Sequence, residues 1–163
     1  VFDWIEKTLR ELGLDQKPWQ EMTLLRREFD QLTIDQENYG LIHYDFEPDN
    51  VFYDETSQRC RVIDFDDAMY HWFVMDVVQS LDAIRDETGR DDISDLEIQF
   101  LGGYQSKFAL DDQVFNKQPL FRRFARLYQY TRVANAMQES WDNEPDWMND
   151  LRKRLTKQIL IEF

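Results

Sequence analysis

The sequence predicts a mostly helical α+β domain that carries one small β-element near residues 40–65. On both sides of that element, long stretches place apolar residues three or four positions apart, the spacing of a buried helix face. Between them, polar residues separate three short and mainly apolar runs, a pattern typical of strands and turns: 41–43, 51–53 and 60–65. A length of 163 residues is enough for one core, so we expect a single domain over 1–163.

The helical stretches have recognisable start and end signals. In residues 1–12 the apolar side chains follow helical spacing, and Gly13 lies where a helix C-cap is expected. Pro18 suits the first turn of a second helix that continues to Leu32. Beyond the β-element, apolar stripes predict further helices over 74–84, over 93–101 with an interruption at Gly102-Gly103, over 118–138, and onward from Asn143.

Residues 51–64 are expected to form a β-hairpin. Two mainly apolar runs flank a polar segment, residues 54–58, whose composition is typical of a turn. Loops held by such a rigid frame are common positions for catalytic residues. Cys60 lies within the second strand, and we expect its thiol to be buried.

The charge distribution excludes some classes of partner. Net charge is −14, and residues 1–100 carry 9 basic and 25 acidic side chains, a balance of −16. An acidic field of this kind disfavours nucleic acid and attracts cations. No apolar run reaches the roughly 20 residues that span a bilayer, and the single cysteine excludes an internal disulfide. We therefore expect a cytoplasmic protein with no membrane or nucleic-acid partner.

Three polar residues near the hairpin have a spacing that suits phosphoryl transfer. Asn50 follows Asp45 by five residues, and Asp64 comes at the end of the second predicted strand. Phosphoryl transfer needs a carboxylate that orients the attacking hydroxyl and accepts its proton. It also needs hard oxygen ligands for Mg²⁺, which neutralises charge on the nucleotide phosphates. Two carboxylates and an amide in this order supply those parts.

The same segment resembles the catalytic motifs of aminoglycoside phosphotransferases, choline kinase and related small-molecule kinases. The resemblance rests on two stretches, His43-Tyr44-Asp45-Phe46-Glu47-Pro48-Asp49-Asn50 and, after the hairpin, Ile63-Asp64-Phe65-Asp66. Protein kinases usually carry Lys where Glu47 stands, which argues against a protein kinase. Two departures bear on substrate contacts: Tyr44 stands where many relatives have Gly, and Phe46-Glu47 replaces the usual Leu-His.

The resemblance implies a role for each matching residue. Asp45 would be the catalytic base, and Asn50 and Asp64 would hold Mg²⁺ on the phosphates of ATP or GTP. His43 and Asp76 would support the catalytic loop. Asp66 would make a second contact with metal or with substrate. The implied acceptor is a hydroxyl of a small molecule, and the acidic half of the chain favours a cationic one.

The resemblance covers only the C-terminal lobe of a protein-kinase-like fold. The Gly-rich phosphate loop and the nucleotide-binding Lys belong to an N-terminal lobe and are absent from these 163 residues. We therefore expect that lobe as a partner in cis, and an isolated fragment that is inactive. Its interface is expected to include exposed aromatic side chains, with Trp4, Phe46 and Phe52 as candidates.

Two other functions compete with the kinase hypothesis. A kinase-like binding protein would hold a ligand or partner without phosphate transfer, although the retained Asp45, Asn50 and Asp64 weigh against it. A metal-dependent hydrolase would use His43 with Asp45 and Asp64 as ligands. The chain has only two histidines, and His71 is expected to be structural, so the hydrolase is the poorer alternative.

Overall fold

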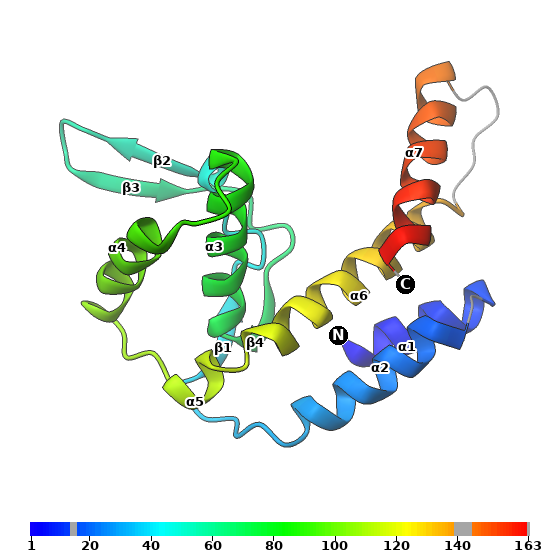
Figure 1. Ribbon diagram of the computed structural model, residues 1–163, viewed down its shortest axis with the longest axis horizontal. Coiled ribbons are helices and arrows are strands. Elements are labelled where there is room, and N and C mark those ends of the chain that lie inside the picture. The colour runs from blue at the N-terminus through cyan, green and yellow to red at the C-terminus, as the bar shows by residue number, and fades with distance from the viewer. Residues whose placement is uncertain (14–15, 139–144, 163) are drawn as a thin grey trace. The chain divides into compact units, whose positions relative to one another are not determined.

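A computed structural model of the protein describes residues 1–13, 16–138 and 145–162, with side chains through Leu155. Seven helices, four strands and one short 3-10 turn follow one another along the described chain (Figure 1). Their bounds are α1 Phe2–Leu12, α2 Gln16–Phe29, β1 Tyr39–Ile42, η1 Pro48–Asn50, β2 Val51–Asp54, β3 Arg59–Val62, β4 Met69–Trp72, α3 Val74–Thr88, α4 Ser94–Gln105, α5 Asp112–Phe115, α6 Gln118–Ala136 and α7 Asp146–Glu162. The content is mostly helical with small antiparallel sheets, as the sequence predicts.

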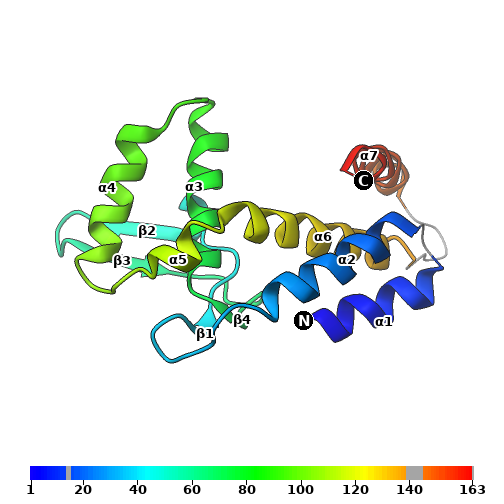
Figure 2. The ribbon, with the colours of Figure 1, turned by 60° about the horizontal axis from the view of Figure 1, so that its bottom comes forward.

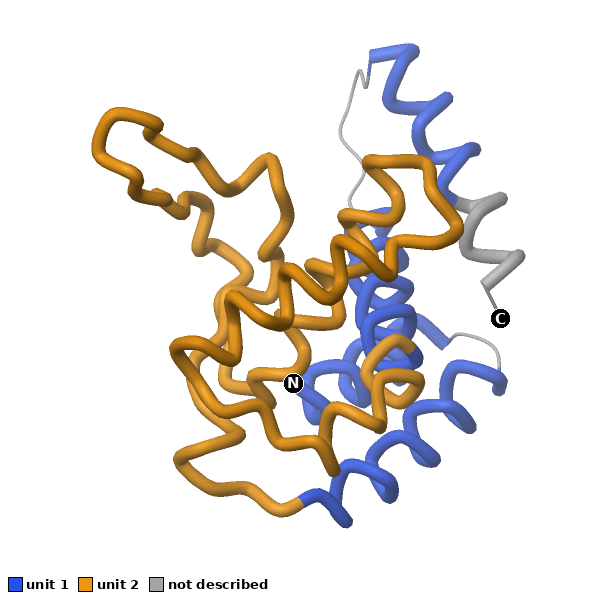
Figure 3. Tube along the Cα trace, turned by 60° about the vertical axis from the view of Figure 1, so that its left-hand side comes forward, with its two compact units in different colours: residues 1–32, 123–163 blue, residues 33–122 orange. Residues whose placement is uncertain are grey.

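The chain divides into two compact units (Figure 3). Unit 1 comprises residues 1–32 and 123–163, and unit 2 comprises residues 33–122. Unit 2 contains both sheets and the whole of the catalytic-loop motif. No described helix combines the length and the apolar character that a membrane span requires.

Unit 1 is an all-helical assembly built on aromatic contacts. The ring of Phe2 lies 5.6 Å from that of Phe29 and 5.5 Å from that of Phe124. The expected C-cap is present, because Gly13 adopts φ 58° and donates its N–H to the Arg10 carbonyl. Arg123 makes ion pairs at 2.7 Å with two glutamates of α2, Glu21 and Glu28. The start of the last helix, expected at Asn143, lies outside the described residues.

Unit 2 contains two separate two-stranded antiparallel sheets. The expected hairpin pairs β2 with β3, from Val51 opposite Val62 to Asp54 opposite Arg59. Strand β1 pairs with β4, a strand that the sequence analysis did not anticipate. The β1–β4 pair carries the chain directly into the catalytic loop on one side and into α3 on the other.

The core of unit 2 lies between α3 and α4, which run antiparallel and are joined by a short connection (Figure 2). Val77, Leu81 and Ile93 are almost fully buried there. Partly buried apolar residues surround these three: Ile84, Leu96, Phe100, Leu101, Tyr104, Leu110 and Phe115. The start of α6 is fixed to α3 by a bidentate ion pair, in which Arg122 Nε and Nη2 donate to Asp82 at 2.7 and 2.8 Å.

Two local expectations were wrong. Helix α4 continues through Gly102-Gly103 to Gln105, because the packed apolar face of the helix outweighs the low helix propensity of glycine. Cys60 is exposed rather than buried. Strand β3 is exposed along most of its length, so its apolar side chains do not form a core face.

Candidate active site

The catalytic loop is fixed to the first turn of α3 by one carboxylate. Asp76 accepts hydrogen bonds from two successive backbone amides, His43 N at 2.9 Å to Oδ2 and Tyr44 N at 2.8 Å to Oδ1. Tyr44 is buried and has φ 69°, in the left-handed region that L residues rarely adopt. This geometry explains why glycine suits that position, and the Asp76 carboxylate offsets the strain in a chain that has tyrosine there.

Burial and hydrogen bonding act on Asp76 in opposite directions. Burial raises the pKa of the Asp76 carboxyl above its ordinary value, while the amides of His43 and Tyr44 act to lower that pKa. Ser80, one turn further along α3, places its hydroxyl 2.8 Å from both the Phe46 and the Asp76 carbonyl oxygens. Two side chains of one helix thus hold three consecutive parts of the loop.

His43 connects the catalytic loop to the base of the hairpin, where β3 ends. Its Nε2 lies 2.8 Å from the Ile63 carbonyl oxygen, an acceptor, so Nε2 carries the hydrogen in this contact. Its other ring nitrogen, Nδ1, is buried and has no hydrogen-bond partner among the described residues. The imidazole lies against the rings of Phe65 and Phe46, with centroid distances of 4.5 and 5.7 Å. The ring is therefore enclosed between the two motifs.

The Asn50 side chain contacts Asp45 through its amide nitrogen. Asn50 Nδ2 donates to the Asp45 carbonyl at 2.9 Å and to Asp45 Oδ2 at 3.0 Å. Both hydrogen bonds use the amide nitrogen, which leaves the amide oxygen Oδ1 available as a hard oxygen ligand. The Asn50 carbonyl accepts a hydrogen bond from Ile63 N at 3.1 Å. One residue thus orients the Asp45 carboxylate and closes the base of the hairpin.

The hairpin register brings Asn50 and Asp64 to the same end of the sheet. Val51 and Val62 are paired, so the residues that flank this pair leave the sheet side by side. Asp64 has φ 61° and is exposed, and its carboxylate makes no hydrogen bond or ion pair with described residues. The far end is closed by Asp54, which accepts from Ser57 Oγ at 2.7 Å. The hairpin therefore fixes the separation of two oxygen-bearing side chains.

The mouth of the loop is strongly acidic. Burial raises the pKa of Glu47, and the neighbouring charges of Asp45, Asp49 and Asp86 raise it further. Three carboxylates therefore lie near enough to Glu47 for their charges to disfavour its ionised form. A cation placed near them would relieve that repulsion.

Most of the residues singled out from the sequence are thus brought together. Hydrogen bonds join Asp76 to His43 and Tyr44, and another joins Asn50 to Asp45. The hairpin register brings Asp64 next to Asn50. Asp66 is exposed and makes no hydrogen bond or ion pair with described residues. No three His, Cys, Asp or Glu side chains of the described chain form a group able to hold a metal ion. The sequence analysis missed Ser80, whose only signal was its position one turn after Asp76 on the same helix.

The chain belongs to the phosphotransferase enzyme family, whose sequence model matches residues 2–110. Over 61 residues it is 38% identical to an amicoumacin kinase of Bacillus subtilis (strain 168), an alignment that covers 37% of this chain and 18% of that protein. A solved structure of an amicoumacin kinase, hAmiN in complex with AMP-PNP, Ca²⁺ and Ami, is similar with a TM-score of 0.63 and 25% identity.

The structural match is uneven in its coverage of the two chains. The similarity to hAmiN covers 87% of this chain but 43% of that one. The described chain therefore spans less than half the length of the proteins that it resembles.

Proposed function

We propose that the protein containing this chain transfers the γ-phosphate of ATP or GTP to a hydroxyl of a small cationic molecule. The observation that supports this most directly is the contact between Asn50 Nδ2 and Asp45 Oδ2, at the base of a hairpin that also presents Asp64. It joins a proton-accepting carboxylate and two oxygen ligands in one rigid element, which is the set of groups that phosphoryl transfer requires. The related hAmiN was solved with a nucleotide analogue and Ca²⁺, and this supports nucleotide and cation binding here.

Asp45 is the proposed catalytic base. One of its carboxylate oxygens accepts from Asn50, so the other is available to accept a hydrogen bond from the acceptor hydroxyl. The loop beneath it is held by Asp76, Ser80 and His43, which act as positioning residues. A carboxylate fixed in this way orients the attacking oxygen without having to be ordered at the moment of reaction.

Asn50 and Asp64 are the proposed ligands of Mg²⁺. Their chemistry fits this ion, because Asn50 Oδ1 and the Asp64 carboxylate are hard oxygen donors not engaged in hydrogen bonds with described residues. Two protein ligands are also the small number typical of Mg²⁺, whose remaining positions are filled by phosphate oxygens and water. When bound, the ion would neutralise charge on the nucleotide phosphates. Asp66 is a further candidate ligand or substrate contact.

The acceptor is proposed to be cationic because the entrance to the loop is acidic. The charges of Asp49 and Asp86 act on Glu47 and raise its pKa. An amino sugar or an amino alcohol would be attracted by these carboxylates, whereas a neutral acceptor would gain no such attraction and an anionic acceptor would be repelled. The structure of hAmiN with Ami agrees with a small-molecule acceptor for the family.

The remaining part of the nucleotide site is proposed to come from an N-terminal lobe. The hairpin exposes 56% of Phe52 and 47% of Ile63, which are large apolar areas to leave in water next to a catalytic loop. In unit 1, Trp4 is 38% exposed. A nucleotide and a second lobe would cover such surfaces, so the isolated chain is expected to bind nucleotide weakly and to show negligible turnover.

The test is steady-state kinetics of the full-length protein with Mg²⁺, ATP or GTP, and a panel of amino sugars and amino alcohols. Asp45→Asn is expected to lower kcat by about 10²–10⁴-fold, because general-base assistance is lost. Glu55→Gln is the matched control, since Glu55 is an exposed carboxylate at the hairpin turn, and kcat should stay within about twofold. Turnover that is unaffected by Asp45→Asn would exclude Asp45 as the base. Nucleotide binding without turnover on any acceptor would favour a kinase-like binding protein.

A further inference from the structure

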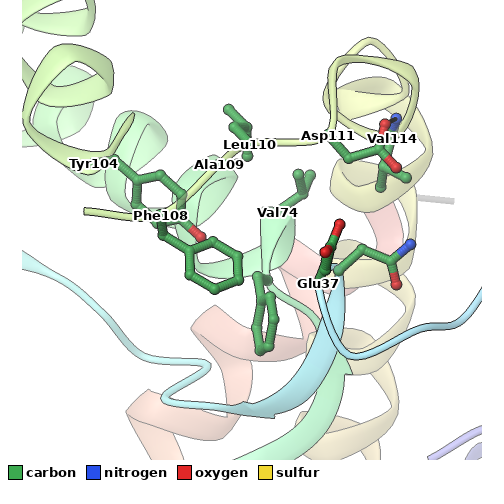
Figure 4. A pocket seen from close by; sticks show the side chains of 10 residues that line it. Glu37, Val74, Tyr104, Phe108, Ala109, Leu110, Asp111 and Val114 are labelled. Carbon is green, nitrogen blue, oxygen red and sulfur yellow. Dashed lines mark hydrogen bonds between the residues drawn. The ribbon is translucent and has the colours of Figure 1, made fainter. Parts of the chain in front are cut away.

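A small recess in unit 2 is lined by residues that belong to neither the catalytic loop nor the hairpin (Figure 4). Four parts of unit 2 form it: the segment before β1, the start of α3, the end of α4 with the connection that follows, and α5. Its lining combines aromatic, apolar and acidic side chains and contains no Lys, Arg or His: Glu37, Asn38, Phe73, Val74, Tyr104, Phe108, Ala109, Leu110, Asp111 and Val114. The enclosed space accommodates a group of about the size of one water molecule.

One wall of the recess is a set of three aromatic rings. Phe73 and Phe108 meet edge to face with centroids 5.2 Å apart, and Phe108 and Tyr104 do so at 6.2 Å. Phe73 is held in place by its backbone, whose N–H donates to the Asn38 carbonyl at 2.9 Å. The faces of such rings carry partial negative charge and attract cations.

Three polar side chains of the recess have oxygen atoms that are free to accept a hydrogen bond from a ligand. The Glu37 carboxylate makes no hydrogen bond or ion pair with described residues, and the Tyr104 hydroxyl has no hydrogen-bond partner among them. Asp111 uses Oδ1 to accept from Gln113 N and Val114 N, which leaves Oδ2 unengaged. Burial and the charge of Asp76 raise the pKa of Tyr104, so the phenol is neutral at physiological pH. The recess thus offers negative charge and lone pairs on one side and ring surface on the other.

We propose that this recess binds the primary ammonium group of a small organic amine. The ammonium would donate to Glu37 and to the Tyr104 hydroxyl oxygen, while the rings of Phe73 and Phe108 would stabilise its positive charge. Size selects the class of amine, because a –NH₃⁺ group is about as large as a water molecule and a quaternary ammonium is several times larger. An anion is disfavoured, because both charged side chains of the lining are acidic.

Amine binding at this recess uses none of the residues proposed for phosphate transfer. None of its lining residues belongs to the catalytic loop or the hairpin. Phe73 and Val74 do precede Asp76 by only three and two residues, so an occupied recess would stiffen the helix turn that holds the loop. Binding of an amine here requires neither nucleotide nor metal, and the inference therefore stands apart from the proposed function.

The test is a titration of the full-length protein, labelled with ¹³C in the Phe and Tyr rings, followed by NMR. The probe is ethylammonium, with ethanol as the neutral control of similar size and tetramethylammonium as the oversized cation. Saturable shifts of the Phe73, Phe108 and Tyr104 ring signals are expected for ethylammonium alone. Glu37→Gln should weaken its affinity by about tenfold, the loss expected for one charge-assisted hydrogen bond.

Two further variants separate binding from unfolding. Tyr104→Phe removes one hydroxyl and keeps the ring, so it should weaken affinity by a smaller factor, about threefold. Glu55→Gln changes an exposed carboxylate outside the recess and should leave the titration unchanged. Absence of a saturable shift, an equal response to tetramethylammonium, or unchanged affinity in Glu37→Gln would each overturn the proposal. Glu37 is exposed, and its variant is expected to keep the thermal midpoint of the parent.

Discussion

Replacing Asp76 by asparagine is expected to lower the free energy of unfolding by about 2–4 kcal/mol. The carboxylate accepts two backbone hydrogen bonds of 2.9 and 2.8 Å, and each hydrogen bond to a charged group contributes about 1.5–3 kcal/mol. Asparagine has one carbonyl oxygen, so one amide keeps its acceptor and the other faces an NH₂ group, at a cost of about 1–3 kcal/mol. Part of this loss is offset, because a neutral amide costs less free energy to bury than a carboxylate does. The same burial cost raises the pKa of Asp76.

Urea unfolding of the parent and of Asp76→Asn measures this difference directly. Asp86→Asn is the control, because Asp86 is exposed on the same helix and its variant should change the free energy of unfolding by less than about 0.5 kcal/mol. A loss below about 1 kcal/mol in Asp76→Asn, or an equal loss in Asp86→Asn, would refute the assignment of the two hydrogen bonds to stability.

Hydrogen exchange locates the effect within the loop. The amides of His43 and Tyr44 should exchange about 30-fold faster or more in Asp76→Asn if local opening becomes easier by about 2 kcal/mol. Amides of α4 should be much less affected, because α4 does not contain either donor. Equal acceleration in the loop and in α4 would instead show that the substitution acts by global unfolding.

Three further predictions concern other parts of unit 2. Burial lowers the pKa of His71 to about 3, so below pH 6.5 the unfolded state binds a proton that the folded state does not. The free energy of unfolding should therefore decrease as the pH is lowered, by up to about 1.4 kcal/mol per pH unit. Urea unfolding at pH 6.5 and pH 5 should show that difference and its loss in His71→Phe. Gly40→Ala should lower the thermal midpoint, because its Cβ would lie 2.8 Å from the neighbouring phenylalanine ring, whereas Gly102→Ala has nothing within 4 Å and should raise it. A lower thermal midpoint for Gly102→Ala would contradict the prediction for that variant. Asn50→Asp should lower kcat of the full-length protein about 100-fold, because it places a second carboxylate where the amide now donates to Asp45 at 3.0 Å; an unchanged kcat would exclude this contact from catalysis.

The sequence predicted the parts of the fold that depend on local signals. The helices at 1–12 and 118–138, the C-cap at Gly13 and the hairpin all follow from apolar spacing and turn composition. The candidate catalytic loop stands out in the sequence because its residue types and spacing match those that phosphoryl transfer requires. Tyr44 was noticed as a departure from glycine, but only the structure supplies the reason, a backbone with φ 69°.

The features that sequence analysis missed depend on tertiary contacts. Strand β4 has little local signal, because its partner β1 is about thirty residues earlier and its register is set by that pairing. The exposure of Cys60 depends on whether another layer covers the hairpin, which the alternation within a strand does not reveal. Asp64 could be proposed as a metal ligand from its motif, but its place beside Asn50 follows only from the pairing of Val51 with Val62.

The β2–β3 hairpin separates a part of the chain that must keep its length from a part that can vary. Asn50 and Asp64 leave its base, whereas the exposed turn from Asp54 to Gln58 lies at its tip (Figure 1). Residues added at the tip extend the chain into solvent and leave the base pairing intact, at a small cost in loop entropy. One residue added inside either strand would shift the pairing and turn the side chains beyond it to the opposite face. The tip is therefore a natural insertion point for a tag or a fluorescent reporter.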